Sequence, residues 1–195
     1  RRHRRLHQVG RAREILRRER MFDRGLDVVE TLEAAGWNVT IDEFAFTFVG
    51  PSTLEQLTPV NEEYPTGPFT GSGPGDVTAA VTPVDVQLTT PNTNTSGCDA
   101  ADFAGFPAGN IALIQRGACD FAVKALNAEA AGASGVIIFN AGDDDTDARN
   151  ELIVGTLGGS NIVGIPVVGA SYQQGVALAQ PGSTARVMVP VPEER

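Results

Sequence analysis

The fold is decided by residues 98–140, CDAADFAGFPAGNIALIQRGACDFAVKALNAEAAGASGVIIFN. Two short apolar runs, Ile111–Gln115 and Val136–Asn140, are rich in branched residues, and the alanine-rich stretch Asp120–Ala131 lies between them. Apolar runs on either side of a helical segment are typical of parallel strands that are buried on both faces and joined by a right-handed crossover. The stretch therefore predicts a βαβ unit.

The predicted helix begins at Asp120, whose carboxylate is placed to accept hydrogen bonds from the amides two and three residues further on. Phe121, Ala125, Ala128 and Gly132 then recur at helical spacing. Because three of these four side chains are small, we expect the helix to lie close to the sheet.

The same segment resembles a known family. The pattern Arg116-Gly-x-Cys119-x-Phe121-x-x-Lys124, the glycine- and alanine-rich turn before Gly135-Val-Ile-Ile, and a later Ile-Pro-Val-Val-Gly169 are similar to the protease-associated (PA) domain. The resemblance implies a mixed α/β fold (α+β in its details), with a partly closed mixed β-sheet, two flanking helices and the parallel βαβ unit. It also implies a non-catalytic module, found in secreted or lumenal peptidases and in sorting receptors.

Residues 23–50 predict a helix followed by a long strand. Apolar residues recur at helical spacing up to Gly36, which suits a left-handed C-terminal cap, and Trp37–Val49 then alternates, with a bulge near Glu43. This order is similar to the opening of secreted zinc aminopeptidases of the aminopeptidase Y type, in which a PA domain follows the first strand. The resemblance implies that residues 23–50 are a remnant of a peptidase lobe and that residues 51–192 are the PA domain.

Residues 1–22 differ from the rest of the chain in composition, and we treat them as a basic leader of doubtful status. Residues 1–20 hold nine of the fifteen Lys and Arg of the chain. Three interpretations stay open: a basic arm for nucleic acid or anionic lipid, a solvated leader, and a wrongly translated start. We favour the last and assign the segment no function.

Outside the central unit, further elements alternate with loops rich in Gly and Pro. Residues 62–75 predict a loop. The predicted helix covers residues 172–180, and the predicted strands cover residues 54–57 (strand or turn), 76–82, 84–88, 152–154, 165–168 and 184–191.

The charge distribution excludes one class of partner. The formal net charge is −9 over 195 residues, although the first 20 residues carry a balance of +7. An acidic body repels phosphate backbones, so we expect no nucleic-acid binding by the globular part. No apolar run approaches the length of a membrane span or of a signal peptide's core.

Cys98 and Cys119 are the two cysteines. If they are oxidised, the disulfide would close a loop and raise the free energy of unfolding by about 3 kcal/mol. Two thiols alone leave a disulfide and a reduced pair both open. The resemblance to secreted modules implies the disulfide and an extracellular location.

The sequence supplies no catalytic site. His3 and His7 are the two histidines, and both lie in the basic leader. We find no HExxH, GxSxG or P-loop motif, so we assign no catalytic residue, no metal ligand and no cofactor in this chain. In aminopeptidase Y-like enzymes the zinc ligands follow the PA domain, so the resemblance implies zinc in a catalytic domain of the parent protein.

A ligand site is expected at the ends of the parallel strands, because ligands of open α/β sheets collect beyond the carboxyl ends. The candidate rim consists of Arg116, Asn140, Asp143, Ser171 and Tyr172. It would contact an extended peptide. The alternative is that Arg116, Phe121 and Lys124 only stabilise the fold, with the two cations pairing with local carbonyls or carboxylates.

The acidic loop Asp143–Asp147 has four aspartates in five positions. Such oxygens can ligate calcium, but the glycine and glutamate of an EF-hand loop are missing. A solvated loop tip is the favoured interpretation.

Two functions follow as expectations. The first is a PA-domain fragment of a secreted zinc aminopeptidase that covers the active site or mediates substrate or protein interaction, so its partners are a peptide or protein substrate or the parent's catalytic domain. The alternative is a stand-alone peptide- or protein-binding PA module, or one from a subtilisin-like peptidase or sorting receptor. The helix and strand of residues 23–49 favour the aminopeptidase.

Overall fold

The structure, a computed structural model, describes residues 27–40, 42, 44–48, 50–89, 94–142 and 147–194. The chain separates into two compact units, residues 1–45 and residues 46–195. Our expectations for residues 1–22, for the bulge at Glu43 and for Asp143 lie outside the described residues.

In the first unit, residues 27–34 are helical and exposed over most of their surface. Gly36 has a φ of 88°, as expected for a left-handed cap. The amide of Trp37 donates to the carbonyl of Leu32 (3.0 Å) and the amide of Gly36 to that of Glu33 (2.9 Å). This pair of bonds is the Schellman motif, which satisfies carbonyls that the end of a helix leaves open.

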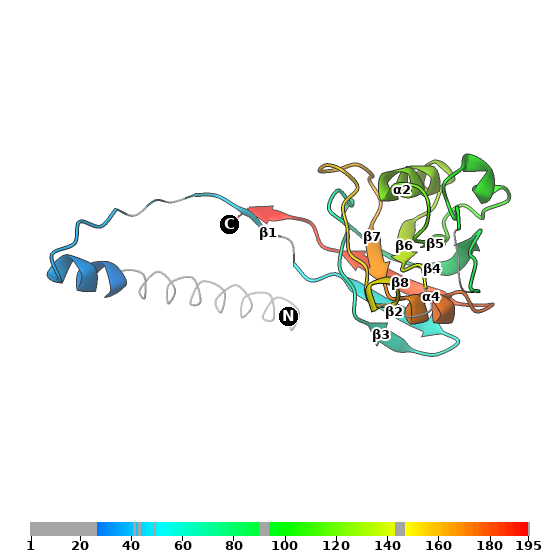
Figure 1. The fold of residues 1–195 in the computed structure, drawn as a ribbon, viewed down its shortest axis with the longest axis horizontal. Coiled ribbons are helices and arrows are strands. Elements are labelled where there is room, and N and C mark those ends of the chain that lie inside the picture. The colour runs from blue at the N-terminus through cyan, green and yellow to red at the C-terminus, as the bar shows by residue number, and fades with distance from the viewer. Residues whose placement is uncertain are drawn as a thin grey trace, which may run out of the picture. The chain divides into compact units, whose positions relative to one another are not determined.

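The second unit contains a seven-stranded sheet with the order β3-β2-β8-β4-β5-β6-β7 (Figure 1). Its strands are β2 (Thr53–Thr58), β3 (Glu62–Tyr64), β4 (Gly75–Val84), β5 (Ile111–Gln115), β6 (Gly135–Phe139), β7 (Val167–Ala170) and β8 (Thr184–Val189). The helices of this unit are η1 (Ala100–Phe103), α2 (Phe121–Ala130), α3 (Asp147–Asn150) and α4 (Tyr172–Leu178).

The sheet is mixed because β4 changes partner along its length. Residues 75–80 pair antiparallel with β8, and residues 81–84 pair parallel with β5, which continues in parallel to β6 and β7. The predicted fold class and the predicted βαβ unit, β5-α2-β6, are therefore confirmed. Of the two strands that we expected at 76–82 and 84–88, the first lies within β4, which ends at Val84, and residues 85–88 form no strand. Pro83 lies where β4 has a single neighbour, so its missing N–H need not interrupt a second ladder.

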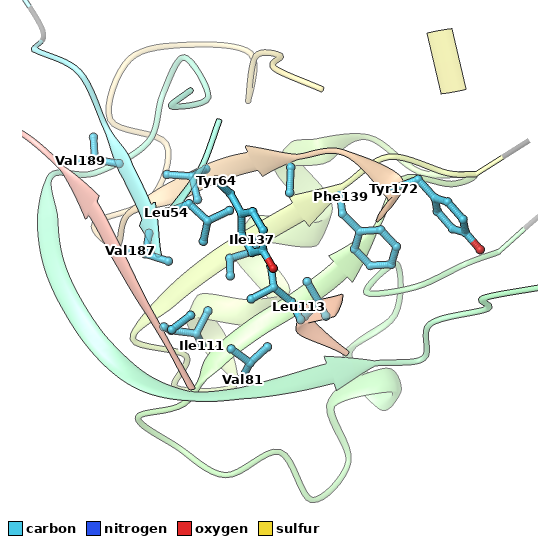
Figure 2. Close-up of a cluster of buried hydrophobic side chains, with 14 residues drawn as sticks. Leu54, Tyr64, Val81, Ile111, Leu113, Ile137, Phe139, Tyr172, Val187 and Val189 are labelled. Atoms are coloured by element: carbon cyan, nitrogen blue, oxygen red, sulfur yellow. The ribbon is translucent and has the colours of Figure 1, made fainter. Parts of the chain in front are cut away.

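Alternation along β5 and β6 divides the core into two layers. Ile111 and Leu113 belong to the cluster that packs under α4, whereas Ala112 and Ile114 belong to the cluster under α2. Figure 2 shows the first cluster, in which Leu113 and its neighbours on β6 lie together with side chains of β2, β4 and β8. Continuous apolar runs were therefore correctly interpreted as strands buried on both faces.

Four local predictions were wrong. The loop expected at residues 62–75 begins with a strand instead, since Glu62–Tyr64 form β3 and pair with β2. Asp120 occupies the N-cap position of α2, but its side chain accepts no capping hydrogen bond. Residues 152–154 form no strand: the amide of Ile153 makes a single long bond to the carbonyl of Ala170 in β7 (3.5 Å), and no ladder follows from it. The strand expected at residues 165–168 is displaced to β7.

The long strand expected over residues 37–49 is also wrong. Within the described residues it is reduced to β1 (Thr47–Phe48), which pairs with β9 (Glu193–Glu194). A strand needs a neighbour for its backbone groups, and β9 offers a partner for two residues only. Trp37 and Phe44 remain 69% and 78% exposed.

Candidate functional site

A pocket of about 370 Å³ lies at the carboxyl end of β5, where the strand turns into α2. One wall is the turn of residues 116–120 and the start of α2, and the other is the segment of residues 156–158. The pocket is lined by Arg116, Gly117, Cys119, Asp120, Phe121, Ala122, Thr156, Leu157 and Gly158. This is the edge of the sheet at which the sequence predicted a ligand site.

The structure brings two of the predicted rim residues together. Arg116 Nη1 lies 3.3 Å from Asn140 Oδ1 and 3.4 Å from the carbonyl of Ala148. The amide of Asn140 donates to the carbonyls of Ala148 (3.1 Å) and Glu151 (2.8 Å), so this buried side chain fixes the segment that follows the acidic loop. Arg116 is half-buried and lines the pocket, whereas Asn140 supports it from beneath.

Ser171 and Tyr172 have structural contacts at the start of α4. Ser171 Oγ accepts a hydrogen bond from the amide of Gln174 (3.2 Å), and Gln174 Oε1 accepts one from the amide of Ser171 (2.7 Å), which forms a capping box. Tyr172 is 8% exposed, and its hydroxyl donates to the carbonyl of Leu88 (2.9 Å). Neither lines the pocket. Asp143 lies outside the described residues.

The turn that carries Arg116 is held by a preceding loop, which sequence reasoning missed. Buried Asn94 donates from Nδ2 to the carbonyl of Arg116 (2.9 Å), and its own carbonyl accepts from the amide of Ala118 (3.1 Å). A Cβ on Gly117 would lie 2.1 Å from that carbonyl oxygen of Asn94, so the approach requires glycine. The signal was present in the Arg-Gly pair, but the partner loop is distant in sequence.

A disulfide joins Cys98 to Cys119 and ties the same turn to the region before η1. The resemblance implied this bond. Since Cys119 lines the pocket and Cys98 does not, the disulfide connects the pocket wall to a part of the chain that packs elsewhere.

Lys124 is the one lysine of the sequence, and its side chain is fully buried on α2. Its ammonium group donates to the carbonyl of Ser96 and lies 3.6 Å from Cys98 Sγ. Burial lowers the pKa of Lys124 to about 8, although the carboxylate of Asp102 acts in the opposite direction. A lysine that pairs with a local carbonyl agrees with the structural role that the sequence left open for it.

A second pocket, of about 280 Å³, lies between residues 68–74 and residues 189–192. Its lining contains prolines, hydroxyl groups and an amide but no titratable side chain. The first pocket, which has Arg116 and Asp120 on its rim, is therefore the better candidate for recognising a polar ligand.

The described residues do not fit a zinc site. Among them no three His, Cys, Asp or Glu side chains come together in a group that could hold a metal ion. In the same part of the chain, no helix is long and apolar enough to cross a membrane.

Comparison with known proteins agrees with this architecture. The family model described as "PA domain" matches residues 77–178. An aminopeptidase of Pseudomonas aeruginosa is 51% identical over 160 residues, which cover 78% of this chain and 30% of the relative.

Two solved structures are similar over most of the chain. The aminopeptidase from Aneurinibacillus sp. strain AM-1 has a TM-score of 0.56 at 33% identity, covering 85% of this chain and 37% of that one. BSAP, a zinc aminopeptidase from Bacillus subtilis, has a TM-score of 0.54 at 25% identity, covering 88% of this chain and 39% of that one. The chain thus spans between about a third and two fifths of the length of these relatives. On the match of residues 77–178, the chain belongs to the PA domain family.

Proposed function

We propose that this chain is the N-terminal and PA portion of a secreted zinc aminopeptidase. In this proposal residues 23–50 belong to the peptidase lobe, and residues 51–192 are the non-catalytic PA domain. The zinc ion belongs to a catalytic domain of the parent protein, since the described residues supply no ligand set for it.

One observation carries the proposal: the similarity to an aminopeptidase reaches beyond the PA domain. The relative from Pseudomonas aeruginosa matches 78% of this chain, which is more than residues 51–195 amount to together. Part of the matched sequence must therefore precede residue 51. A PA module shared with an unrelated parent would be expected to match within the module alone.

The exposed aromatic side chains of the N-terminal segment support the same assignment. Trp37 is 69% exposed and Phe44 is 78% exposed. Large apolar side chains grouped along one short segment usually mark an interaction surface. In the proposal these side chains pack within the peptidase lobe of the parent.

The role of the PA domain is to contact peptides that approach the active site. Arg116 supplies hydrogen-bond donors at the pocket and exposed Asp120 supplies acceptors, so the two side chains can pair with the carbonyl and amide groups of an extended peptide. Asn140 would act by holding Arg116 in place. Ser171 and Tyr172 are given no contact with the peptide, because neither lines the pocket and their side chains are engaged elsewhere.

Peptide binding to this chain tests the proposal. Fluorescence anisotropy with labelled peptide pools is expected to give saturable binding that weakens in Arg116→Ala. The control is Gln173→Ala, an exposed residue of α4 that does not line the pocket. Equal binding by both variants would remove Arg116 from the site. Hydrolysis of aminoacyl anilides by this chain with added zinc would contradict the non-catalytic assignment.

A further inference from the structure

The two sulfurs of the disulfide have different surroundings. Cys98 Sγ lies 3.6 Å from the Nζ atom of Lys124, a side chain with no exposed surface. Cys119 is half-buried in the wall of the pocket, next to the exposed residues Gly117 and Ala118. One sulfur therefore lies next to a buried cation, and the other belongs to a residue that lines a pocket.

The ammonium group of Lys124 has few competing partners. Its hydrogen bond goes to the neutral carbonyl of Ser96, and the charged group that acts on it from the neighbouring element η1 is Asp102. At neutral pH the lysine is mainly protonated, since its pKa is about 8. An anion formed at Cys98 would gain a charge-assisted contact in a region of low dielectric.

Cys98 is also the more firmly held of the two cysteines. Asn127 Nδ2 donates to the carbonyls of Gly97 (3.1 Å) and Cys98 (3.0 Å), and the amide of Cys98 donates to the carbonyl of Thr95 (2.8 Å). These bonds do not depend on the disulfide. If the disulfide opens, Cys98 stays next to Lys124, while the turn of Cys119 loses its covalent tie.

We propose that Cys119 is a site of reversible modification by small thiols such as glutathione, with Cys98 as the leaving group. The incoming thiolate attacks Cys119 Sγ and forms a new S–S bond. The Cys98–Cys119 bond breaks, and its electron pair goes to Cys98 Sγ, which becomes a thiolate next to the Lys124 ammonium. No net electrons are needed for this exchange. Attack by a second thiol on the mixed disulfide releases Cys119 and oxidises the pair of external thiols.

The direction of attack follows from leaving-group chemistry. In thiol–disulfide exchange the sulfur whose thiol has the lower pKa leaves faster. A cysteine next to a lysine ammonium has a thiol pKa below the ordinary value of about 8.5. Cys119 also belongs to the pocket lining, where a small thiol can enter, whereas Cys98 is half-buried outside the pocket.

The modification would change the candidate ligand site. The new group would occupy the pocket wall between Arg116 and Asp120, and the turn would lose its covalent tie while keeping its backbone hydrogen bonds to Asn94 and Phe139. A thiol adduct at Cys119 is therefore expected to block peptide binding at this pocket and to be reversed by excess dithiol. The chemistry of the exchange itself does not depend on the proposed function.

The test treats the full chain with reduced glutathione that contains no oxidised glutathione. The reaction is stopped with acid, free thiols are alkylated with iodoacetamide, and peptide mass spectrometry identifies the group on each cysteine. The expected result is glutathione on Cys119 and the alkyl group on Cys98, in at least about threefold excess over the reverse pattern, because the thiol with the lower pKa leaves faster. Equal amounts of the two patterns, or an excess of glutathione on Cys98, would overturn the proposal.

A second measurement compares the two reduced cysteines of the unsubstituted chain and then uses one variant. After full reduction, the rate of alkylation of each cysteine is followed against pH, and circular dichroism checks that the fold is retained. Cys98 is expected to have a midpoint below about 8.5 and below that of Cys119. In Lys124→Met the midpoint of Cys98 is expected to rise by about one unit or more. Identical midpoints for both cysteines in the unsubstituted chain would contradict the role of Lys124.

Discussion

Gly169 lies where a loop crosses the sheet without room for a side chain. A Cβ on this residue of β7 would lie 1.7 Å from the carbonyl oxygen of Ile153. Gly169 is fixed on both sides, because its amide donates to Gly67 (2.9 Å) and its carbonyl accepts from Thr66 Oγ1 (2.6 Å). We therefore expect Gly169→Ala to displace the segment around Ile153 rather than the strand.

The magnitude follows from what that displacement exposes. Ile153 is 8% exposed, and releasing a buried isoleucine costs about 1.5–3 kcal/mol. Overpacking against backbone costs a further ~1–3 kcal/mol where no rotamer change can relieve it. Part of the two costs is shared, so we expect the free energy of unfolding to fall by about 3 kcal/mol, with a melting temperature about 6–12 °C lower.

Urea denaturation followed by circular dichroism measures this loss. The matched control is Gly135→Ala in β6, a neighbouring strand of the same sheet. Its added Cβ would meet Pro166 at 3.4 Å, which is ordinary van der Waals contact. We expect this control to change the free energy of unfolding by less than about 1 kcal/mol.

The outcome also bears on the pocket, because the displaced segment continues into Thr156 and Leu157 of its wall. The reasoning is refuted if Gly169→Ala costs less than about 1 kcal/mol. It is also refuted if the free energy of unfolding falls equally in the two glycine variants, because the backbone that crosses Gly169 would then make no difference to stability.

Three further predictions concern the turn at the pocket. The free energy of unfolding of the double variant Cys98→Ala/Cys119→Ala, measured by urea denaturation, is expected to fall by about 3 kcal/mol, since the disulfide joins residues 21 apart. An unchanged urea midpoint would mean that the loop is ordered without the disulfide. Asn94→Ala is expected to cost about 1–3 kcal/mol, because buried groups of the turn lose their partner; a loss equal to that of an exposed residue would contradict this. The pKa of Lys124 is lowered to about 8 in the folded chain, so the unfolded state binds more protons above that pH and stability rises from pH 8 towards pH 10. Thermal unfolding against pH measures this rise in stability, which should be absent in Lys124→Met. A rise of the same size in that variant would disprove the buried-lysine account.

The central unit was predictable because local pattern and tertiary environment agree in it. The apolar runs of β5 and β6 are buried on both faces, and the small residues Ala125 and Ala128 of α2 lie against the sheet as expected. Gly36 and the capping box of Ser171 were likewise encoded in a few neighbouring residues.

Predictions failed where a distant partner decides the structure. The alternation of residues 37–49 is a strand pattern, but strand formation needs a neighbour, and β9 pairs with two of these residues. Residues 152–154 contain strand formers, but they meet β7 through one backbone bond, from Ile153 to Ala170, and not through a ladder.

The ligand site stays a prediction, although a pocket lies at the place that the sequence indicated. The carboxyl ends of parallel strands gave the location, and Arg116 lines the pocket there. The engagement of Tyr172 with Leu88, and the support of Arg116 by Asn94, depend on chain crossings that no local pattern indicates.

A hybrid enzyme tests the central claim most directly. The aminopeptidase of Pseudomonas aeruginosa would be compared with a form that lacks its PA segment and with a form that carries residues 51–192 of this chain instead. The measurement is kcat/KM for a tetrapeptide relative to that for a small aminoacyl anilide. We predict that deletion changes this ratio and that the hybrid restores it, with Arg116→Ala removing the restoration. An unchanged ratio in all forms would contradict a role of the PA domain in peptide access.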